Sequence, residues 1–163
     1  MGEKQLIAFG IVMLMAIGSM LYMSFGGDTK LLQQKIIQTQ QGVQTVRDWA
    51  VTFAGISTTK DYKDISMQSL KAKGLFNYDV NGSGTSSTIK LPSDDSINLA
   101  LAASSNNKEF IVTVTLASDN NFDETEKQIF EDKLNADLKS SATQVTSYTS
   151  SGADGTISFQ FSN

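Results

Sequence analysis

Apolar residues divide the chain into an uncharged N-terminal stretch and a longer, patterned remainder. Residues 6–25, with the sequence LIAFGIVMLMAIGSMLYMSF, contain no charged side chain. A helix of this length covers about 30 Å, the thickness of the hydrocarbon core of a bilayer. Three interpretations are open: a cleaved secretory signal peptide, a membrane anchor, or an apolar helix that packs against copies of itself. The signal peptide is the weakest, because the only preceding basic residue, Lys4, stands beside Glu3 and the stretch is longer than a signal peptide requires.

The pattern after Gly26 and Gly27 predicts an amphipathic helix over residues 28–55. Seven positions alternate in steps of four and three, which places them along one side of a helix. They are Leu32, Ile36, Thr39, Val43, Val46, Ala50 and Phe53. We therefore expect one long N-terminal helix of about fifty residues, apolar all round in its first half and amphipathic in its second, with the glycine pair as the place for a bend.

The rest of the sequence predicts an α+β head, in which an antiparallel sheet of four or five strands packs on helices. Apolar residues at every second position are typical of strands with one buried face. Strands are predicted at 87–91, 96–102, 109–117, 144–149 and 156–162. The domain organisation expected is a hydrophobic transmembrane or filament-core helix over residues 1–27, followed by the amphipathic half and the globular head over residues 28–163.

Two further helices are predicted in the head. The first covers residues 66–72, with Asp64 or Ser66 as its N-cap, and ends at Gly74, where a positive φ angle is commonly needed. The second covers residues 122–140, with Asn121 as its N-cap. The expected buried side chains of the second helix are Ile129, Phe130, Leu134 and Leu138.

Composition narrows the functional classes. The chain has 163 residues, a formal net charge of −4 and a pI near 4.7, which argues against nucleic acid as a partner. It contains no histidine and no cysteine, so the commonest general base, the commonest metal ligand and all disulfides are missing. We expect no enzymatic activity, no cofactor and no metal ion.

The individual motifs are weak, and each has a plainer interpretation. Asp119, Asn121 and Asp123 have the spacing that begins a calcium loop, but the glycine and glutamate that should follow are missing. A helix cap with an acidic first turn is preferred. Asn81 begins a glycosylation sequon that is also an ordinary turn sequence, and the turn is preferred. Trp49 is expected in the core rather than in a ligand-stacking site.

The order of these elements resembles that of type IV pilins. A hydrophobic N-terminal helix runs into an amphipathic one, a small α+β domain follows, and residues 61–75 are similar to the stretch that enters the head of such pilins. A mature chain that starts with Met1 resembles the type IVb branch. The resemblance implies a filament core of N-terminal helices. The core residues it implies are Leu6, Phe9, Ile11, Leu14, Ile17, Leu21 and Phe25, with flexibility from Gly10, Gly18, Gly26 and Gly27.

Several features depart from the family pattern. Type IV pilins usually carry Glu at the fifth mature position, where it neutralises the N-terminal amine of a neighbouring subunit, whereas this chain has Gln5. The family's C-terminal disulfide and helix-bending proline are also missing. The resemblance therefore implies Met1, Glu3 and Lys4 as assembly residues. Glu3 would pair with Lys4 or the Met1 amine of an adjacent subunit, because an unpaired buried carboxylate costs several kcal/mol.

No leader ending in glycine precedes Met1 in this sequence. We expect that it has been removed, which makes Met1 the processed, N-methylated terminus. The alternative is that processing follows Gly2 and leaves Glu3 at the terminus.

The resemblance implies a major pilin, a structural protein that polymerises into a surface filament used for attachment, aggregation or conjugation. Its implied partners are other copies of the chain, the inner membrane before assembly, an assembly ATPase with its platform protein, and a prepilin peptidase. A minor or tip pilin is one alternative, although such pilins usually carry an enlarged head. A single-pass membrane-anchored periplasmic binding or accessory protein is the alternative from another class.

Overall fold

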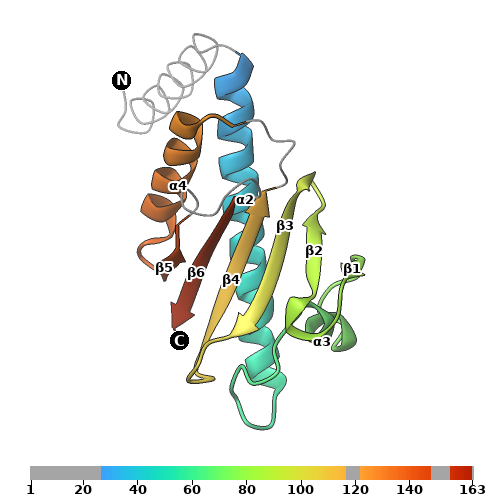
Figure 1. The fold of residues 1–163 in the computed structure, drawn as a ribbon. Helices are drawn as coiled ribbons and strands as arrows, with labels where there is room; N and C mark the ends of the chain where they lie inside the picture. Colours follow the sequence, from blue (N-terminus) through green and yellow to red (C-terminus); the bar gives the residue numbers. More distant parts are fainter. Residues whose placement is uncertain (1–26, 117–121, 148–154, 163) are drawn as a thin grey trace, which may run out of the picture. The chain divides into compact units, whose positions relative to one another are not determined.

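Figure 1 shows the computed structural model, which describes residues 27–116, 122–147 and 155–162. The chain divides into two compact units, Met1–Gln34 and Lys35–Asn163. The second unit holds all the strands described below. No described helix is both long enough and apolar enough to cross a membrane.

The second unit is built on one antiparallel sheet of six strands, in the order β1-β2-β3-β4-β6-β5. Strand β6 lies between β4 and β5, so the last strand of the chain is inserted next to the centre of the sheet (Figure 1). The strands are β1 (Val80–Asn81), β2 (Thr88–Leu91), β3 (Asp94–Ala103), β4 (Glu109–Leu116), β5 (Ala142–Thr146) and β6 (Thr156–Ser162).

One face of the sheet forms the core, as the alternation of apolar residues predicted. Phe110 pairs with Phe161 across β4 and β6, and their rings stack with centroids 5.3 Å apart. The buried apolar strand residues are Ile89, Leu91, Ile97, Leu99, Leu101, Phe110, Val112, Val114, Leu116, Ile157, Phe159 and Phe161. Thr113 and Thr115 point to the other face, where Thr113 Oγ1 lies 3.0 Å from Ser158 Oγ of β6.

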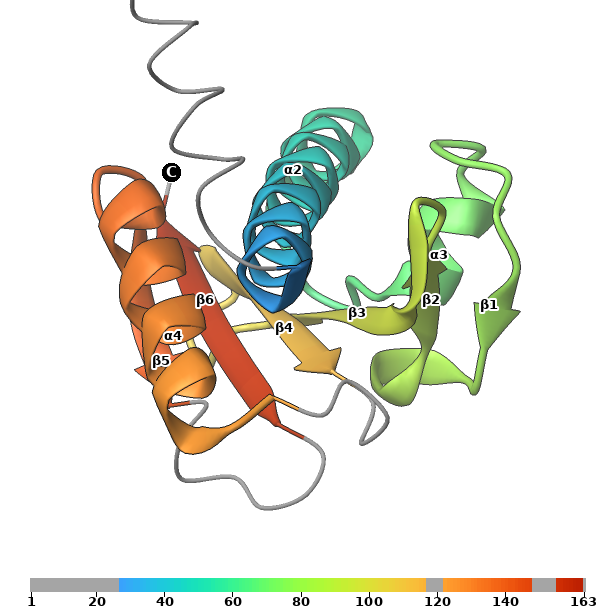
Figure 2. The ribbon, with the colours of Figure 1, turned by 90° about the horizontal axis from the view of Figure 1, so that it is seen from above.

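Helix α2 (Gly27–Ile56) confirms the amphipathic pattern. All seven residues of the predicted stripe are buried, with exposed fractions of 0–7%. From Lys35 onward the helix runs along one face of the sheet (Figure 2). Burial of each large apolar side chain contributes about 1.5–3 kcal/mol, so packing on the sheet holds the helix more strongly than its own propensity does.

The predicted fold class is wrong in two respects. The long described helix has 30 residues rather than about fifty, and charged residues such as Lys35, Arg47 and Asp48 lie along it. The uncharged stretch 6–25 lies outside the described residues. The sheet has six strands rather than four or five, because β1 contains only two residues and is too short to produce an alternating pattern.

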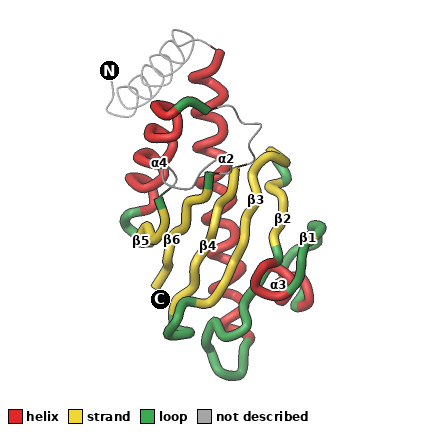
Figure 3. Tube along the Cα trace, viewed as in Figure 1, coloured by secondary structure: helices red, strands yellow, loops and turns green. Residues whose placement is uncertain are grey.

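Helix α3 (Met67–Ala72) begins where predicted. Ser66 is its N-cap and forms a reciprocal capping box with Ser69, whose backbone N–H donates to Ser66 Oγ at 3.1 Å. After the helix, Gly74 has a φ of 73°, as expected at this position. The helix packs against β1, β2 and the short 3₁₀ turn η1 (Gly84–Ser86) beside the edge of the sheet (Figure 3).

Helix α4 (Glu124–Leu138) differs from the prediction at its start and on its buried face. Its N-cap is Asp123, which forms a capping box with Glu126, whereas the expected cap Asn121 lies outside the described residues. Phe130, Leu134 and Leu138 are fully buried, but Ile129 is 48% exposed. Glu131 is buried in its place, because its carboxylate accepts hydrogen bonds from Gln144 of β5 and from Ser147.

Candidate functional site

The predicted assembly site falls in the part of the chain that the structure does not describe. Of its residues, only Gly27 is described, and it is the first residue of α2. The others are Met1, Glu3, Lys4, Leu6, Phe9, Gly10, Ile11, Leu14, Ile17, Gly18, Leu21, Phe25 and Gly26. Their proposed roles therefore stay predictions.

The calcium-like spacing receives no support from the described residues. Asp119 and Asn121 lie outside them, and Asp123 serves as the N-cap of α4. Within the described ranges, no group of three or more acidic side chains is arranged to hold a metal ion. Asn81 is exposed at the end of β1, and the following Gly82 has a φ of 79°, which fits the predicted turn.

A partly buried ion pair connects α2 to the start of β3. Lys35 Nζ lies 2.6 Å from Asp94 Oδ2 and donates to Ser96 Oγ at 2.7 Å. Ser96 in turn donates to Asp94 Oδ1 through both its hydroxyl and its backbone N–H. Burial alone would raise the pKa of the Asp94 carboxyl, but the hydrogen bonds from Lys35 and Ser96 and the Lys35 charge together hold that pKa below its ordinary value. The Asp94 carboxyl is therefore ionised at neutral pH, and its contact with Lys35 joins the helix to the sheet.

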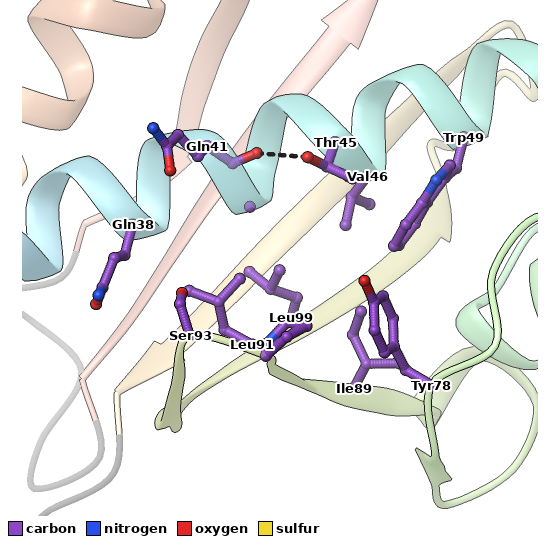
Figure 4. A pocket seen from close by; sticks show the side chains of 12 residues that line it. Gln38, Gln41, Thr45, Val46, Trp49, Tyr78, Ile89, Leu91, Ser93 and Leu99 are labelled. Carbon is purple, nitrogen blue, oxygen red and sulfur yellow. Dashed lines mark hydrogen bonds between the residues drawn. The ribbon is translucent and has the colours of Figure 1, made fainter.

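A groove of about 190 Å³ lies between α2 and the strands β2 and β3 (Figure 4). Ile89 and Leu91 of β2 and Leu99 of β3 provide its apolar wall. Gly42 faces this wall closely: a Cβ atom added there would lie 2.6 Å from Leu91 Cδ1. The absence of a side chain at this position thus lets the helix lie close to β2 and β3.

An aromatic cluster closes one end of the groove. Trp49 extends from α2 toward Tyr78, which comes from the segment between α3 and β1 (Figure 4). The Trp49 ring stacks on Phe76 with centroids 4.7 Å apart and lies 6.1 Å from the ring of Tyr78. Trp49 and Phe76 are half-buried and Tyr78 is 43% exposed. Trp49 is therefore not the fully buried core residue that its place on the helix predicted.

Polar side chains line the other end of the groove. Gln38 extends from α2 on the side of β2, and Ser93 lies below it in the turn between β2 and β3 (Figure 4). Thr45 stands between this end and the aromatic end, with its hydroxyl donating to the Gln41 carbonyl at 2.8 Å. All described lining residues are uncharged. The groove is thus neutral, apolar on one wall, and polar along its rim.

The sequence carried a partial signal for the aromatic cluster. Phe76 and Tyr78 are two residues apart, so in an extended segment they share one side, and Trp49 lies one turn beyond the buried Val46. These spacings do not show which turn of α2 the rings of Phe76 and Tyr78 contact. The ion pair had no local signal, because Lys35 and Asp94 are 59 residues apart.

The outward face of α2 carries exposed apolar residues. Ile37 is 52% exposed and Val51 is 40% exposed, and glutamines at 40, 41 and 44 lie between them. Scattered exposed apolar residues are ordinary on a protein surface. Here they lie on the helix that directly follows the uncharged stretch, on the side that does not pack on the sheet.

No protein family model, curated protein or solved structure matches this chain. The resemblance to type IV pilins therefore remains one of element order and residue pattern.

Proposed function

We propose that this chain is the structural subunit of a surface filament of the type IV pilus kind, with a type IVb-like major pilin as the closest description. It polymerises with copies of itself and has no catalytic role. The unassembled subunit resides in the inner membrane, and the filament is extracellular. Assembly needs an external motor, that is, an ATPase with a platform protein, and a prepilin peptidase prepares the subunit.

One observation carries the proposal: an uncharged stretch of membrane length directly precedes an amphipathic helix that belongs to a small antiparallel head. The stretch supplies apolar surface that must be covered, either by lipid or by the same stretch of neighbouring subunits. Lipid covers this surface in the membrane and neighbouring subunits cover it in the filament, so it is kept away from water in both states. The exposed Ile37 and Val51 give α2 further apolar surface that a neighbouring subunit would bury.

Electron microscopy of material sheared from cells that express the chain tests the proposal, with an antibody against the head as the label. We expect filaments labelled along their length, and none from cells that lack the assembly ATPase. Label at filament ends only would identify the chain as a minor or tip pilin rather than a major pilin. Retention of all the protein in the membrane fraction, in cells with a complete assembly machinery, would favour a membrane-anchored accessory protein instead.

A further inference from the structure

Asn81 is the one asparagine of the sequence that a glycine follows. The amide carbon of an asparagine lies within reach of the backbone nitrogen of the next residue, and attack by that nitrogen closes a succinimide ring. A side chain on the next residue hinders this approach, and glycine has none. The Asn81-Gly82 bond is therefore the place in the chain where such a ring closes with the least steric resistance.

The turn that follows β1 requires this glycine. Gly82 has a φ of 79°, a conformation that residues with a side chain rarely adopt. A Cβ atom added at this position would lie 3.0 Å from the carbonyl oxygen of Ser86. The turn therefore needs the same residue that makes Asn81 reactive.

The surroundings of Asn81 leave its side chain able to rotate. Asn81 is exposed, and in the part of the chain that the structure describes its amide makes no hydrogen bond. It is the second and last residue of β1, which lies at the edge of the sheet and pairs only with β2 (Figure 1). Short segments with few contacts open at a small cost in free energy. Ring closure therefore needs at most the opening of this short strand.

Asn106 is exposed as well, but its amide is held at both ends. Its side-chain nitrogen donates to Glu109 Oε2 at 3.0 Å, and its side-chain oxygen accepts from the backbone N–H of Lys108 at 2.9 Å. The residue that follows it, Asn107, carries a side chain. Asn106 thus lacks both features that favour ring closure at Asn81, and it serves as a control within the same chain.

We propose that Asn81 is a site of spontaneous deamidation in the folded protein. The Gly82 nitrogen forms a bond to Asn81 Cγ, the bond from Cγ to the amide nitrogen breaks, and that nitrogen leaves as ammonia with the proton of the Gly82 N–H. Water then opens the succinimide at one of its two carbonyl groups and gives aspartate or isoaspartate. Both products carry a new carboxylate, and isoaspartate also adds a methylene group to the backbone where β1 enters the turn.

Peptide mapping by mass spectrometry measures the reaction. The full chain is incubated in detergent at mildly alkaline pH, beside a synthetic peptide of residues 76–86 that serves as the unfolded reference. We expect Asn81 of the folded chain to convert at a rate within about ten-fold of that of the peptide, which corresponds to less than about 1.4 kcal/mol of protection. Asn106 should convert at least about ten-fold more slowly than Asn81. Backbone fragmentation should show isoaspartate as well as aspartate at position 81.

Two substitutions test the mechanism, and a third is the matched control. Asn81→Gln should abolish the reaction, because the longer side chain would have to close a larger ring. Gly82→Ala should slow it about ten-fold or more. Gly84→Ala also places a side chain at a positive φ in the same turn, but it leaves the residue after Asn81 unchanged and should leave the rate unchanged. Circular dichroism confirms that each variant is folded, and Asn81→Gln keeps the test valid if a glycine variant is not.

Three results would overturn the inference, and none of them bears on filament formation. The first is conversion of Asn81 in the folded chain that is more than about ten-fold slower than in the peptide, which would mean that the turn protects it. The second is conversion of Asn106 as fast as that of Asn81. The third is aspartate as the sole product, which would indicate direct hydrolysis of the amide without a succinimide.

Discussion

Thr39 is a polar residue in the apolar stripe of α2. Its side chain is completely buried, and among the described residues its Oγ1 has no hydrogen-bond partner. A buried hydroxyl without a partner loses the hydrogen bonds it made to water and gains none in return. The spacing of the stripe predicted its burial, but only the packed structure shows that the hydroxyl stays unpaired.

Replacing this hydroxyl by a methyl group should stabilise the protein. We expect Thr39→Val to raise the free energy of unfolding by about 1 kcal/mol, because the shape is kept and the desolvation cost is removed. Thr45→Val is the control, since Thr45 is exposed and already donates to the Gln41 carbonyl. Urea unfolding of the full chain measures both, and a loss of stability in Thr39→Val would contradict the expectation.

The ion pair between Lys35 and Asp94 should behave as a coupled unit. Lys35→Met leaves the largely buried Asp94 carboxylate without its cation, and we expect a loss of about 2–3 kcal/mol in the free energy of unfolding. The double variant Lys35→Met/Asp94→Leu should recover most of that loss, because no unpaired charge remains. Lys71→Ala, which removes an exposed pair with Asp79 at 3.9 Å, should change stability by less than about 0.5 kcal/mol. Equal losses in the single and double variants would contradict this coupling.

The same pair makes stability depend on acid pH. Since folding lowers the pKa of Asp94 from its ordinary value of 3.8, the unfolded chain binds a proton at this carboxyl before the folded chain does. The stabilisation is fully present above pH 3.8 and is lost as the pH falls through the lower folded pKa. The difference in unfolding free energy between the native chain and Asp94→Asn should therefore stay constant from about pH 5 to 7 and shrink below pH 3.8. A difference in unfolding free energy that grows on acidification would contradict this prediction.

At the scale of elements, α2 contains two glycines in contrasting surroundings. A Cβ atom at Gly42 would lie 2.6 Å from Leu91 Cδ1 and 3.1 Å from Leu99 Cδ1, whereas one at Gly55 would meet nothing within 4 Å. Alanine favours a helix over glycine by up to about 1 kcal/mol, and this gain is smaller at Gly55, near the end of α2, than at Gly42 in its interior. The two substitutions differ most in what the added methyl group meets.

We expect Gly55→Ala to raise the free energy of unfolding by about 0.5 kcal/mol, which is part of the propensity difference because the residue lies near the helix end. The free energy of unfolding of Gly42→Ala should be about 1–2 kcal/mol lower than that of Gly55→Ala, because the leucine side chains of β2 and β3 must shift to admit the methyl group. Urea unfolding of the two variants measures this difference. Equal gains in the two variants would contradict this expectation, because Leu91 and Leu99 would then move aside without cost.

Helix α4 shows how periodicity can place an element but misassign one of its positions. Ile129 and Phe130 are adjacent, so the helical pattern allowed either neighbour of Phe130 to complete the buried face. The buried neighbour is Glu131, because hydrogen bonds from Gln144 and Ser147 offset the cost of burying its carboxylate. Those partners come from β5 and the residues after it, which the sequence of the helix does not reveal.

At the scale of the whole molecule, the proposed filament predicts different consequences for two equally exposed isoleucines. Ile37 lies on the outward face of α2 and is 52% exposed, and Ile129 lies on α4 and is 48% exposed. Ile37→Gln and Ile129→Gln should both leave stability within about 0.5 kcal/mol, as surface substitutions usually do. Ile37→Gln should lower the yield of sheared filaments and Ile129→Gln should not. Equal yields in quantitative immunoblots of the sheared fraction would contradict a role for this face of α2.

The local elements could be predicted from the sequence, because their signals repeat over short distances. The stripe of α2 recurs every three or four residues and the strands β3, β4 and β6 alternate at every second residue, so each burial pattern is written within its own segment. Which segments contact one another became visible in the folded chain alone. It placed β6 between β4 and β5, joined Lys35 to Asp94, and brought Tyr78 to Trp49 at the end of the groove. These contacts join residues far apart in the chain, and their energies depend on the packing of the whole sheet and helix rather than on any local pattern.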